Sequence, residues 1–390
     1  MYPNLSYILH ALFGTEPDNA FSIVQTFGLF LVFSFLAAAY FFKKELRRKA
    51  DEGLFQPTYV DVSAKQPFAW FDNIINGFIL GLIAMKTTHI ALNYETFQKD
   101  PSGFLLTADG PWLILLVVLG VFTFVRYNAW KKIKHSERPA QRVAVYPHDR
   151  VGDITVIAAF SGIFGSKLFS VMEDLPGFFQ NPVGSFFSGS GLNIYGGLIV
   201  GFLAVYYYIR KHNIEPLHVM DAIAPALIIS YGVGRMGCQF SGDGDWGIVN
   251  NNPVPSWWIL PDSWWASTYP HNVIDDGVSI AGCTWQHCMQ LAQPVYPTPI
   301  YEIIASIVIF LILWALRKRV KVPGVLFFIY MILNGVERFW IEKIRINDKY
   351  SFMGLNMTQA EYIAVLYIIV AIGCIIYFTR KHQSKNGANV

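Results

Sequence analysis

"DAIAPALIISYGVGRMGCQFSGDGDWG", residues Asp221 to Gly247, starts as an apolar helix and ends in a turn rich in glycine and acidic residues. Arg235 lies where the apolar helix should still be inside lipid. An ionisable side chain within a membrane span is costly unless it reaches water, a partner or a ligand. The stretch therefore predicts a membrane helix that carries a functional cation near one end.

The composition of the whole chain supports a membrane protein. Of its 390 residues, 53% are hydrophobic and only 15% are charged. A soluble chain normally carries about 25% charged residues. The net charge of +3 is small, and no basic tract with interleaved aromatic residues indicates nucleic-acid binding. We therefore expect an integral membrane protein with no nucleic-acid partner.

Nine segments are apolar over the roughly 17 to 25 residues that a membrane helix needs. A helix satisfies its own backbone hydrogen bonds in lipid, so we expect an all-α polytopic membrane protein with nine transmembrane helices. These segments are Phe21–Phe42, Phe68–Leu92, Trp112–Trp130, Ile154–Met172, Leu192–Ile209, Val219–Arg235, Ile300–Leu316, Val325–Ile341 and Tyr362–Phe378.

The distribution of lysine and arginine predicts the orientation. If the N-terminus lies outside, the inner loops hold 22 of the 30 basic residues. The positive-inside rule then puts the N-terminus outside and the C-terminus in the cytoplasm. This orientation gives an outer N-terminal segment (1–20), a first transmembrane helix (21–42) and one long outer loop (238–297).

Three cations lie near the outer ends of three predicted helices: Arg235, Arg338 and Lys167. They could be unrelated side chains that reach toward the interface. The more specific interpretation is that they share an anionic ligand in the outer leaflet. Arginine suits a phosphate because its planar fork donates two parallel hydrogen bonds and never loses its charge.

Acidic residues occur at the same predicted depth. Arg338 and Glu342 are four residues apart, so they share a helix face, either as a structural ion pair or as part of a catalytic site. Other candidate binding residues open the seventh span or follow the sixth: Tyr301, Glu302, Asp243 and Asp245.

"GLNIYGGLIVG", residues Gly191 to Gly201, opens the fifth span on the outer side. Gly196 and Gly197 would allow close approach of a neighbouring helix or of a lipid headgroup. Tyr195 directly precedes them and could place its hydroxyl group in the same outer cavity. Helix packing and ligand binding therefore both remain open for this stretch.

Four motifs in this order resemble the prolipoprotein diacylglyceryl transferase family: "YGGLIVG", the opening stretch, "PTPIYE" and "NGVERFWIE". "FGLFLVFSFLAAAYFF" (Phe27 to Phe42) is similar to the family's first span and "SGIFGSKLFSVME" (Ser161 to Glu173) to its second. The family has seven spans, so the resemblance implies an added two-helix insertion at 43–150 and a transferase-like membrane core at 151–390.

The resemblance implies a bacterial inner-membrane enzyme that moves the diacylglyceryl group of phosphatidylglycerol onto the lipobox cysteine of a prolipoprotein. Arg235 and Arg338 would hold the donor phosphate, and glycerol phosphate would leave. We expect no cofactor and no metal. The remaining alternatives are an anionic-solute transporter and a catalytically inactive homologue that binds lipid or lipoprotein.

The sequence departs from the family pattern at the group that moves the proton. The family has histidine where this chain has Tyr195, and asparagine where it has Cys238. The "SGDGDWG" turn is one residue longer than the family's. Phe27 and Asn334 each replace a family tyrosine. Tyr195, Glu342 or an acid of the 243–245 loop could accept the thiol proton, and the sequence leaves the choice open.

The outer loop has two cysteines of its own. Cys283 and Cys288 flank "TWQH" on the predicted oxidising side, which favours a disulfide. With His287 they could instead be part of a zinc site, although a fourth ligand is not visible. Tryptophan is concentrated here, as in "SWWILPDSWWAS" (Ser256 to Ser267), which suits either an interfacial lid or a plain membrane anchor.

Overall fold

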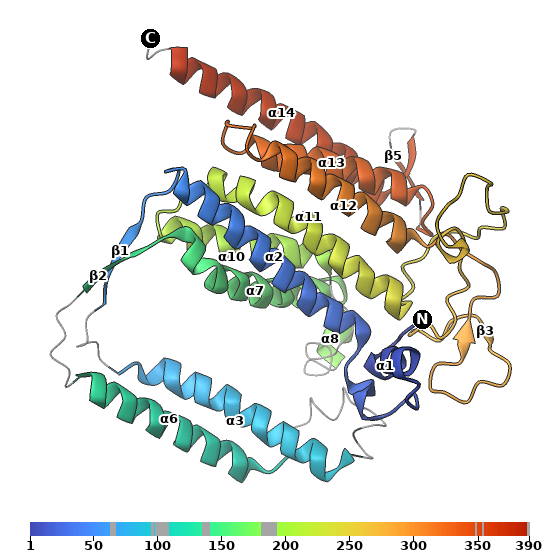
Figure 1. The fold of residues 1–390 in the computed structure, drawn as a ribbon, viewed down its shortest axis with the longest axis horizontal. Helices are drawn as coiled ribbons and strands as arrows, with labels where there is room; N and C mark the ends of the chain where they lie inside the picture. Colours follow the sequence, from blue (N-terminus) through green and yellow to red (C-terminus); the bar gives the residue numbers. More distant parts are fainter. Residues whose placement is uncertain are drawn as a thin grey trace. The chain divides into compact units, whose positions relative to one another are not determined.

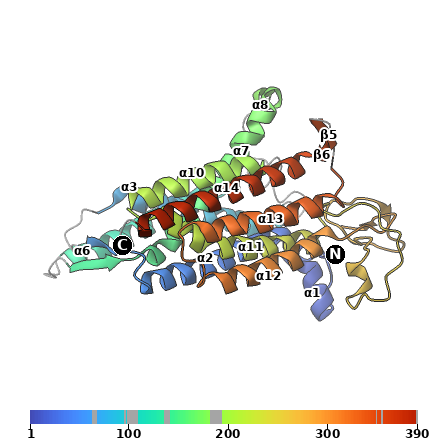
Figure 2. The same cartoon turned by 90° about the horizontal axis from the view of Figure 1, so that it is seen from above.

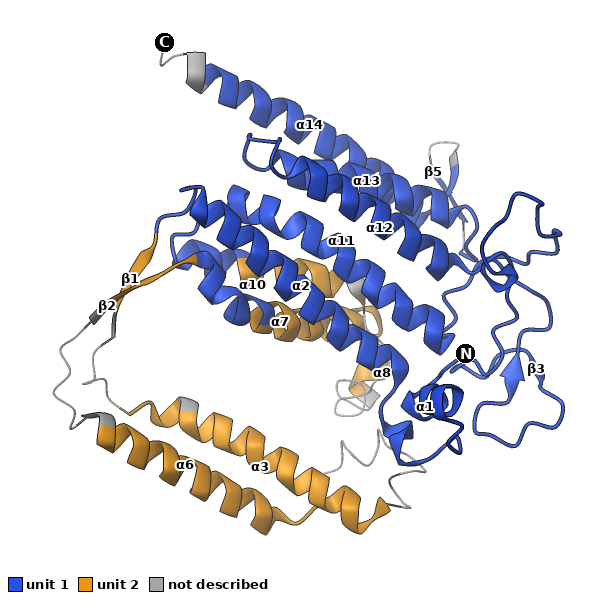
Figure 3. Ribbon diagram, viewed as in Figure 1, with its two compact units in different colours: residues 1–56, 147–155, 206–390 blue, residues 57–146, 156–205 orange. Residues whose placement is uncertain are grey.

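The computed structural model describes residues 1–62, 68–94, 97, 109–134, 141–180, 193–347, 349–352 and 355–387. The chain divides into two compact units (Figure 3). Unit 1 contains Met1–Gln56, Pro147–Thr155 and Tyr206–Val390, and unit 2 contains Pro57–Tyr146 and Val156–Val205. The first segment of unit 2 lies inside the predicted insertion (43–150), and the second lies inside the predicted core.

Most described residues are in helices (Figure 1). The α-helices are α1 (Leu5–Phe13), α2 (Thr26–Asp51), α3 (Trp70–Leu92), α6 (Trp112–Lys134), α7 (Val151–Glu173), α8 (Leu175–Gln180), α10 (Ile194–Lys211), α11 (Pro216–Ser241), α12 (Thr298–Leu316), α13 (Val325–Glu342) and α14 (Gln359–Gly387). Short 3₁₀ turns are η1 (Ala20–Ile23), η2 (Pro147–Arg150) and η3 (Asp262–Trp264).

Within the described residues, seven helices are long and apolar enough to cross a membrane: α2, α3, α6, α7, α11, α12 and α14. The chain is therefore a mostly helical, polytopic membrane protein. The other two predicted spans form helices α10 and α13. α13 contains three charged residues near its end, Glu337, Arg338 and Glu342. The count of nine and the orientation stay predictions.

Three short antiparallel ribbons accompany the helices. β1 (Thr58–Val62) pairs with β2 (Gln141–Val145) in unit 2, with Thr58 opposite Val145. In unit 1, β3 (Val278–Ser279) pairs with β4 (Met289–Gln290), and β5 (Lys349–Phe352) pairs with β6 (Leu355–Thr358). The outer-loop ribbon β3–β4 belongs to the segment that joins α11 to α12.

In unit 1, α11 packs against α2, α12 and α13, and α13 packs against α14 (Figures 1 and 2). The side chains of Ile228, Ile309, Leu313 and Leu326 form a buried cluster between α11, α12 and α13. Apolar contacts of this kind hold the helices side by side, so residues near the same end of different helices can share one site.

α11 runs past the end that the sequence predicts. It starts with Pro216, whose missing N–H costs nothing in a first turn. It ends where Gly242 adopts φ 65° and donates its N–H to the carbonyl of Cys238. Glycine takes this left-handed conformation without a steric cost. Arg235 therefore lies inside the helix, well before its end, rather than at its last residue.

Unit 2 has two helix pairs. α3 packs against α6. The other pair is α7 and α10, where glycines from both helices meet: a Cβ at Gly196 would overlap the backbone of Gly165 and the side chain of Phe169. Such contacts between small residues are typical of membrane helices. The predicted start of α10 at Leu192 lies outside the described residues, and the helix begins at Ile194.

Candidate functional site

Arg235 is bonded to two carboxylates from different parts of unit 1. Its Nη1 contacts Asp245 in the turn after α11, and its Nε contacts Glu302 on α12. The Arg235 side chain is 14% exposed and the Glu302 side chain is fully buried. The Tyr231 hydroxyl also donates to Glu302, and the Arg235 guanidinium lies 5.1 Å from the centre of the Tyr231 ring.

Arg345 completes the site from the segment after α13. Its Nη2 bonds Asp245 Oδ1 at 2.5 Å, and its Nη1 lies 3.3 Å from Glu302 Oε1. Two arginines and two carboxylates therefore bridge one another, and we call Arg235, Asp245, Glu302 and Arg345 the arginine–carboxylate cluster. Charged groups in such a network stay buried only because each is paired and hydrogen-bonded.

A close helix contact places Glu302 beside Arg235. Gly232 of α11 faces Ser306 of α12 so closely that a Cβ at Gly232 would lie 2.9 Å from Ser306 Cβ. Ser306 is one helical turn after Glu302, and Arg235 is three residues after Gly232. The absence of a side chain at Gly232 thus lets the two helices approach until the ion pair can form.

The backbone of the outer loop places Asp245 and Arg345. Gly247 and Arg345 form an isolated antiparallel bridge, and the N–H of Ile248 donates to the carbonyl of Ile344 at 2.8 Å. A Cβ at Gly247 would overlap that same carbonyl oxygen of Ile344. The Thr298 hydroxyl at the start of α12 donates to the carbonyl of Asp245 at 2.6 Å.

The two acids of the loop differ in their electrostatic surroundings. Burial alone would raise the pKa of Asp245, but the guanidinium groups of Arg235 and Arg345 outweigh burial and lower it. Burial raises the pKa of Asp243, and the neighbouring Asp245 carboxylate raises it further. Asp245 is therefore a firmly ionised partner of the arginines, and Asp243 is the more basic carboxylate of the pair.

Arg338 and Glu342 form the ion pair that their spacing predicts, with Nη2 and Oε2 3.0 Å apart. The Arg338 side chain is 29% exposed, while the Glu342 side chain is almost fully buried. Asn347 also donates to Glu342. Among the described residues, Arg338 shares no carboxylate with Arg235.

The other predicted site residues have the following surroundings. In unit 1, the Tyr301 hydroxyl donates to the carbonyl of Trp265 at 3.3 Å. In unit 2, Tyr195 is exposed and Lys167 is buried. Gly196 and Gly197 both face α7, because a Cβ at Gly197 would overlap Ser166 and lie 3.0 Å from the carbonyl oxygen of Gly162. The structure thus gives the two glycines the helix-packing role.

Within the part of the chain that the structure describes, one group of side chains has the ligand types of a metal site. Ligand atoms of Cys238, Asp243 and Asp245 all lie within 4.8 Å of one another. However, both carboxylate oxygens of Asp245 already bond guanidinium groups. A cation here would lie beside the fixed positive charges of Arg235 and Arg345, so the electrostatics disfavour a metal.

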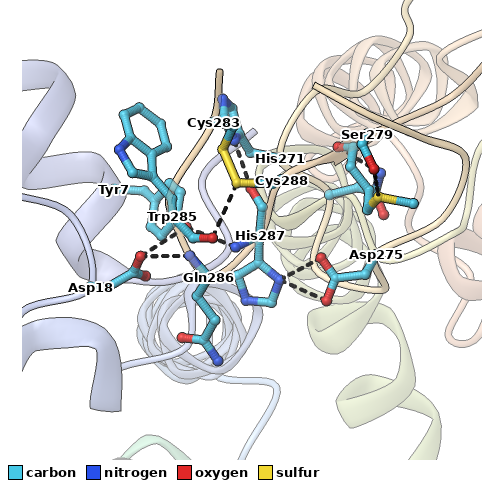
Figure 4. Close-up of a disulfide and its surroundings, with 12 residues drawn as sticks. Tyr7, Asp18, His271, Asp275, Ser279, Cys283, Trp285, Gln286, His287 and Cys288 are labelled. Atoms are coloured by element: carbon cyan, nitrogen blue, oxygen red, sulfur yellow. Dashed lines mark hydrogen bonds and ion pairs between the residues drawn. A yellow bond between two sulfur atoms is a disulfide. The ribbon is translucent and has the colours of Figure 1, made fainter. Parts of the chain in front are cut away.

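The segment between α11 and α12 contains the disulfide that the sequence left open (Figure 4). Cys283 and Cys288 are joined, with their Cα atoms 5.6 Å apart, and this bond removes the thiolates that a zinc site would need. The short loop between them contacts the N-terminal region. Asp18 accepts from the N–H of Gln286 at 2.7 Å, and the Tyr7 hydroxyl accepts from the N–H of His287 at 3.1 Å.

His271 extends the packing around this loop. Its ring stacks on Trp285 with the ring centres 4.6 Å apart, and Nδ1 lies 2.7 Å from the carbonyl oxygen of His287. The Nδ1 atom of His287 in turn lies 3.1 Å from Asp275 Oδ1. Figure 4 shows that these side chains gather around the disulfide. The disulfide therefore fixes a loop that contacts α1 through Tyr7 and the following turn through Asp18.

Two residues in or beside the arginine–carboxylate cluster, Arg345 and Tyr231, are not predicted from the sequence. Arg345 has no predicted role, because its place depends on the bridge to Gly247, which has no local sequence signal. Tyr231 lies within the stretch from Asp221 to Gly247, but the motif alone assigns it no function. Its spacing of four residues before Arg235 was the available signal, since such residues are neighbours on a helix.

Comparison with known proteins identifies the family. The sequence model described as prolipoprotein diacylglyceryl transferase matches residues 106–377, more than half of the chain, and this range includes α6. Three similar proteins are each named phosphatidylglycerol–prolipoprotein diacylglyceryl transferase. The protein of Corynebacterium diphtheriae is 27% identical over 69% of this chain and 89% of its own length. That of Dehalococcoides mccartyi is 26% identical over 70% and 92%.

The protein of Staphylococcus aureus (strain Newman) is 28% identical over 74% of this chain and 94% of its own length. The matched region contains every member of the arginine–carboxylate cluster and the Arg338–Glu342 pair. The comparisons confirm the resemblance seen in the sequence motifs. The chain belongs to the prolipoprotein diacylglyceryl transferase family.

Proposed function

We propose that this protein transfers the diacylglyceryl group of phosphatidylglycerol to the lipobox cysteine of prolipoproteins in the inner membrane of a bacterium. The sulfur bonds to the glycerol carbon of the lipid, and the carbon–oxygen bond to the phosphate breaks. Glycerol phosphate leaves with the electron pair. Family membership supports the substrates and the reaction type, and the observation that carries the proposal is the buried, doubly paired Arg235.

Arg235 and Arg338 are proposed to hold the donor phosphate. The ion pairs of Arg235 use Nε and Nη1, and that of Arg338 uses Nη2. A guanidinium group has five N–H donors, so each arginine keeps donors outside these contacts. Donors already fixed in place stabilise the charge that develops on the departing phosphate without reorganising during the reaction.

The carboxylates of the cluster orient the arginines. Asp245 and Glu302 each bond both Arg235 and Arg345, which limits the rotamers of the two guanidinium groups. A proposed contact to the rest of the lipid comes from Tyr301. A cluster with equal numbers of positive and negative charges also lowers the cost of holding Arg235 inside a helix.

Asp243 is the proposed acceptor of the thiol proton. A cysteine thiol reacts as the thiolate and has a pKa near 8.5. Burial raises the pKa of Asp243 above its ordinary value, and a carboxylate with a raised pKa is a better base near the working pH. The other candidates are Tyr195 and Glu342. Glu342 is already paired with Arg338 and accepts from Asn347.

The decisive experiment supplies the purified protein with phosphatidylglycerol and a lipobox peptide in vesicles. We expect a diacylglyceryl thioether on the peptide and free glycerol phosphate in equal amount. A peptide with serine in place of the cysteine is the matched control and should stay unmodified. No thioether from the cysteine peptide, while a relative named for this activity works in the same vesicles, would refute the proposal.

A further inference from the structure

Glu337 is a buried acid that the proposed chemistry does not use. It lies on α13 directly before Arg338, and it is 8% exposed. Neither of its carboxyl oxygens has a hydrogen-bond partner among the described residues, and both are shielded from solvent. Among the described residues, Glu337 is the one acidic side chain with both oxygens in this situation. A buried polar group without a partner needs a physical explanation.

The charged and titratable groups around Glu337 come from several elements. Arg338 is on the same helix, and Arg345 follows it. α11 contributes Tyr231 and Arg235, and α12 contributes Glu302. Tyr330, about two turns before Glu337 on α13, is also within electrostatic range, and it in turn faces Tyr367 of α14. Glu337 therefore lies beside the arginine–carboxylate cluster without being bonded to it.

The positive charges near Glu337 are already matched. Arg235 and Arg345 are bonded to Asp245 and Glu302, and Arg338 is bonded to Glu342. These are three arginines and three carboxylates. An ionised Glu337 would add a fourth buried negative charge with no cation of its own, and an unpaired buried charge is far more costly than a neutral carboxylic acid.

We propose that Glu337 is kept as a neutral carboxylic acid beside the cluster, and that its ionisation weakens capture of the donor's phosphate. The second half rests on the proposed function, because it assumes that Arg235 and Arg338 bind that phosphate. Glu337 acts through the arginines and touches no reacting atom, so it is a positioning residue. Its proton sets the net charge that an incoming anion meets.

The charges around Glu337 predict how pH changes the affinity for phosphatidylglycerol. While Glu337 is protonated, the three arginines and three carboxylates are balanced, and the remaining N–H donors attract an anion. When the pH rises and Glu337 loses its proton, its negative charge opposes the phosphate. Binding of phosphatidylglycerol should therefore be stronger at low pH and weaker at high pH. Glu337→Gln keeps the shape of the neutral acid and should remove this dependence.

The test measures binding of phosphatidylglycerol to the full-length protein in detergent micelles across neutral and alkaline pH. For the wild type we expect Kd to rise about tenfold, equivalent to about 1.4 kcal/mol. Glu337→Gln should keep the low-pH value of Kd throughout. Glu52→Gln, which alters an exposed acid directly after α2 that is paired with Arg48, should retain the wild-type dependence. Equal pH dependence in the wild type and Glu337→Gln would overturn the proposal.

Infrared spectroscopy tests the protonation state without any lipid or activity. The wild type at neutral pH should show the carbonyl absorption of a protonated carboxyl group, and Glu337→Gln should lack it. If that variant does not fold, the same band must disappear when the wild-type sample is made alkaline. A wild type without the band refutes the neutral acid, whatever the outcome of the binding test.

Different results would refute the transferase activity and the positioning role of Glu337. If the wild type binds no phosphatidylglycerol and transfers nothing, the proposed function fails, and the infrared band still decides whether Glu337 is neutral. If transfer occurs normally but Glu337→Gln loses a hundredfold or more of the rate at neutral pH, Glu337 moves a proton itself. That outcome would overturn the positioning role and leave the transferase intact.

Discussion

At the scale of single residues, the main feature is an arginine fixed inside an apolar helix by two carboxylates. A lone arginine near a membrane boundary could simply reach for water. Arg235 instead contacts Asp245 and Glu302, and both acids also bond Arg345. Removing four charged groups from water costs free energy even when they bond one another. This cost favours a functional reason for keeping them.

The first prediction concerns replacement of arginine by lysine at Arg235 and at Arg338. Lysine keeps the charge but loses the planar fork that donates two parallel hydrogen bonds. Disturbing one charge-assisted hydrogen bond costs about 1.5–3 kcal/mol, or roughly tenfold to over a hundredfold in rate when it is felt fully in the transition state. Turnover at matched protein levels measures the effect. Near-normal rates for both variants would contradict a phosphate clamp.

The second prediction concerns Asp245 and acid. Arg235 and Arg345 lower its folded-state pKa despite burial, so the stabilisation from its charge is complete above the ordinary value of 3.8. It is lost as the pH falls below that value and through the folded-state pKa. Asp245→Asn should therefore lower the Tm at neutral pH, and the gap to the wild type should close in acid. A gap that is independent of pH would show that the charge of Asp245 contributes nothing.

At the scale of elements, glycines decide how closely helices approach. Gly232 brings α11 to α12, and Gly196 and Gly197 bring α10 to α7. The contact of α11 with α12 positions the arginine–carboxylate cluster. The contact of α10 with α7 accounts for the paired glycines without any ligand, although the same residues match a motif of the family.

The third prediction tests that packing in unit 2. Gly196→Ala should destabilise the protein by about 1–3 kcal/mol, because the new methyl group would overlap the backbone of Gly165. Gly120→Ala in α6 is the matched control, since a Cβ there meets nothing within 4 Å, and alanine favours a helix over glycine. Thermal unfolding in detergent compares the two. Equal Tm values for both variants would show that close packing at Gly196 is unimportant.

At the scale of the whole molecule, the orientation of the helices decides which leaflet the arginine–carboxylate cluster faces. In unit 1 the α11–α12 segment, with β3, and the N-terminus lie at one end of the helices, and the C-terminal end of α14 lies at the other (Figure 1). The basic residues between α12 and α13 belong to the predicted inner side. The proposed lipid and prolipoprotein substrates require the cluster to face the outer leaflet.

The fourth prediction is that orientation. A single cysteine at Asn251, in the exposed outer segment, should react with a membrane-impermeant thiol reagent added to intact cells. A single cysteine at Lys318, exposed between α12 and α13, should react only after the cells are opened. The opposite pattern would place Arg235 and Arg338 at the cytoplasmic leaflet and exclude the proposed site for the donor lipid.

The membrane class, the positions of the helices and the family could be predicted from the residues alone, because hydropathy and short motifs are local properties of the chain. The sequence also singled out Arg235, Asp245, Glu302 and the Arg338–Glu342 pair. The fold was needed to show that Arg345 shares Asp245 and Glu302 with Arg235, because that arrangement depends on a backbone bridge between segments far apart in the chain. It also showed that α11 continues to Ser241, where a left-handed glycine ends it, and that the two nearby cysteines, Cys283 and Cys288, bond each other rather than a metal.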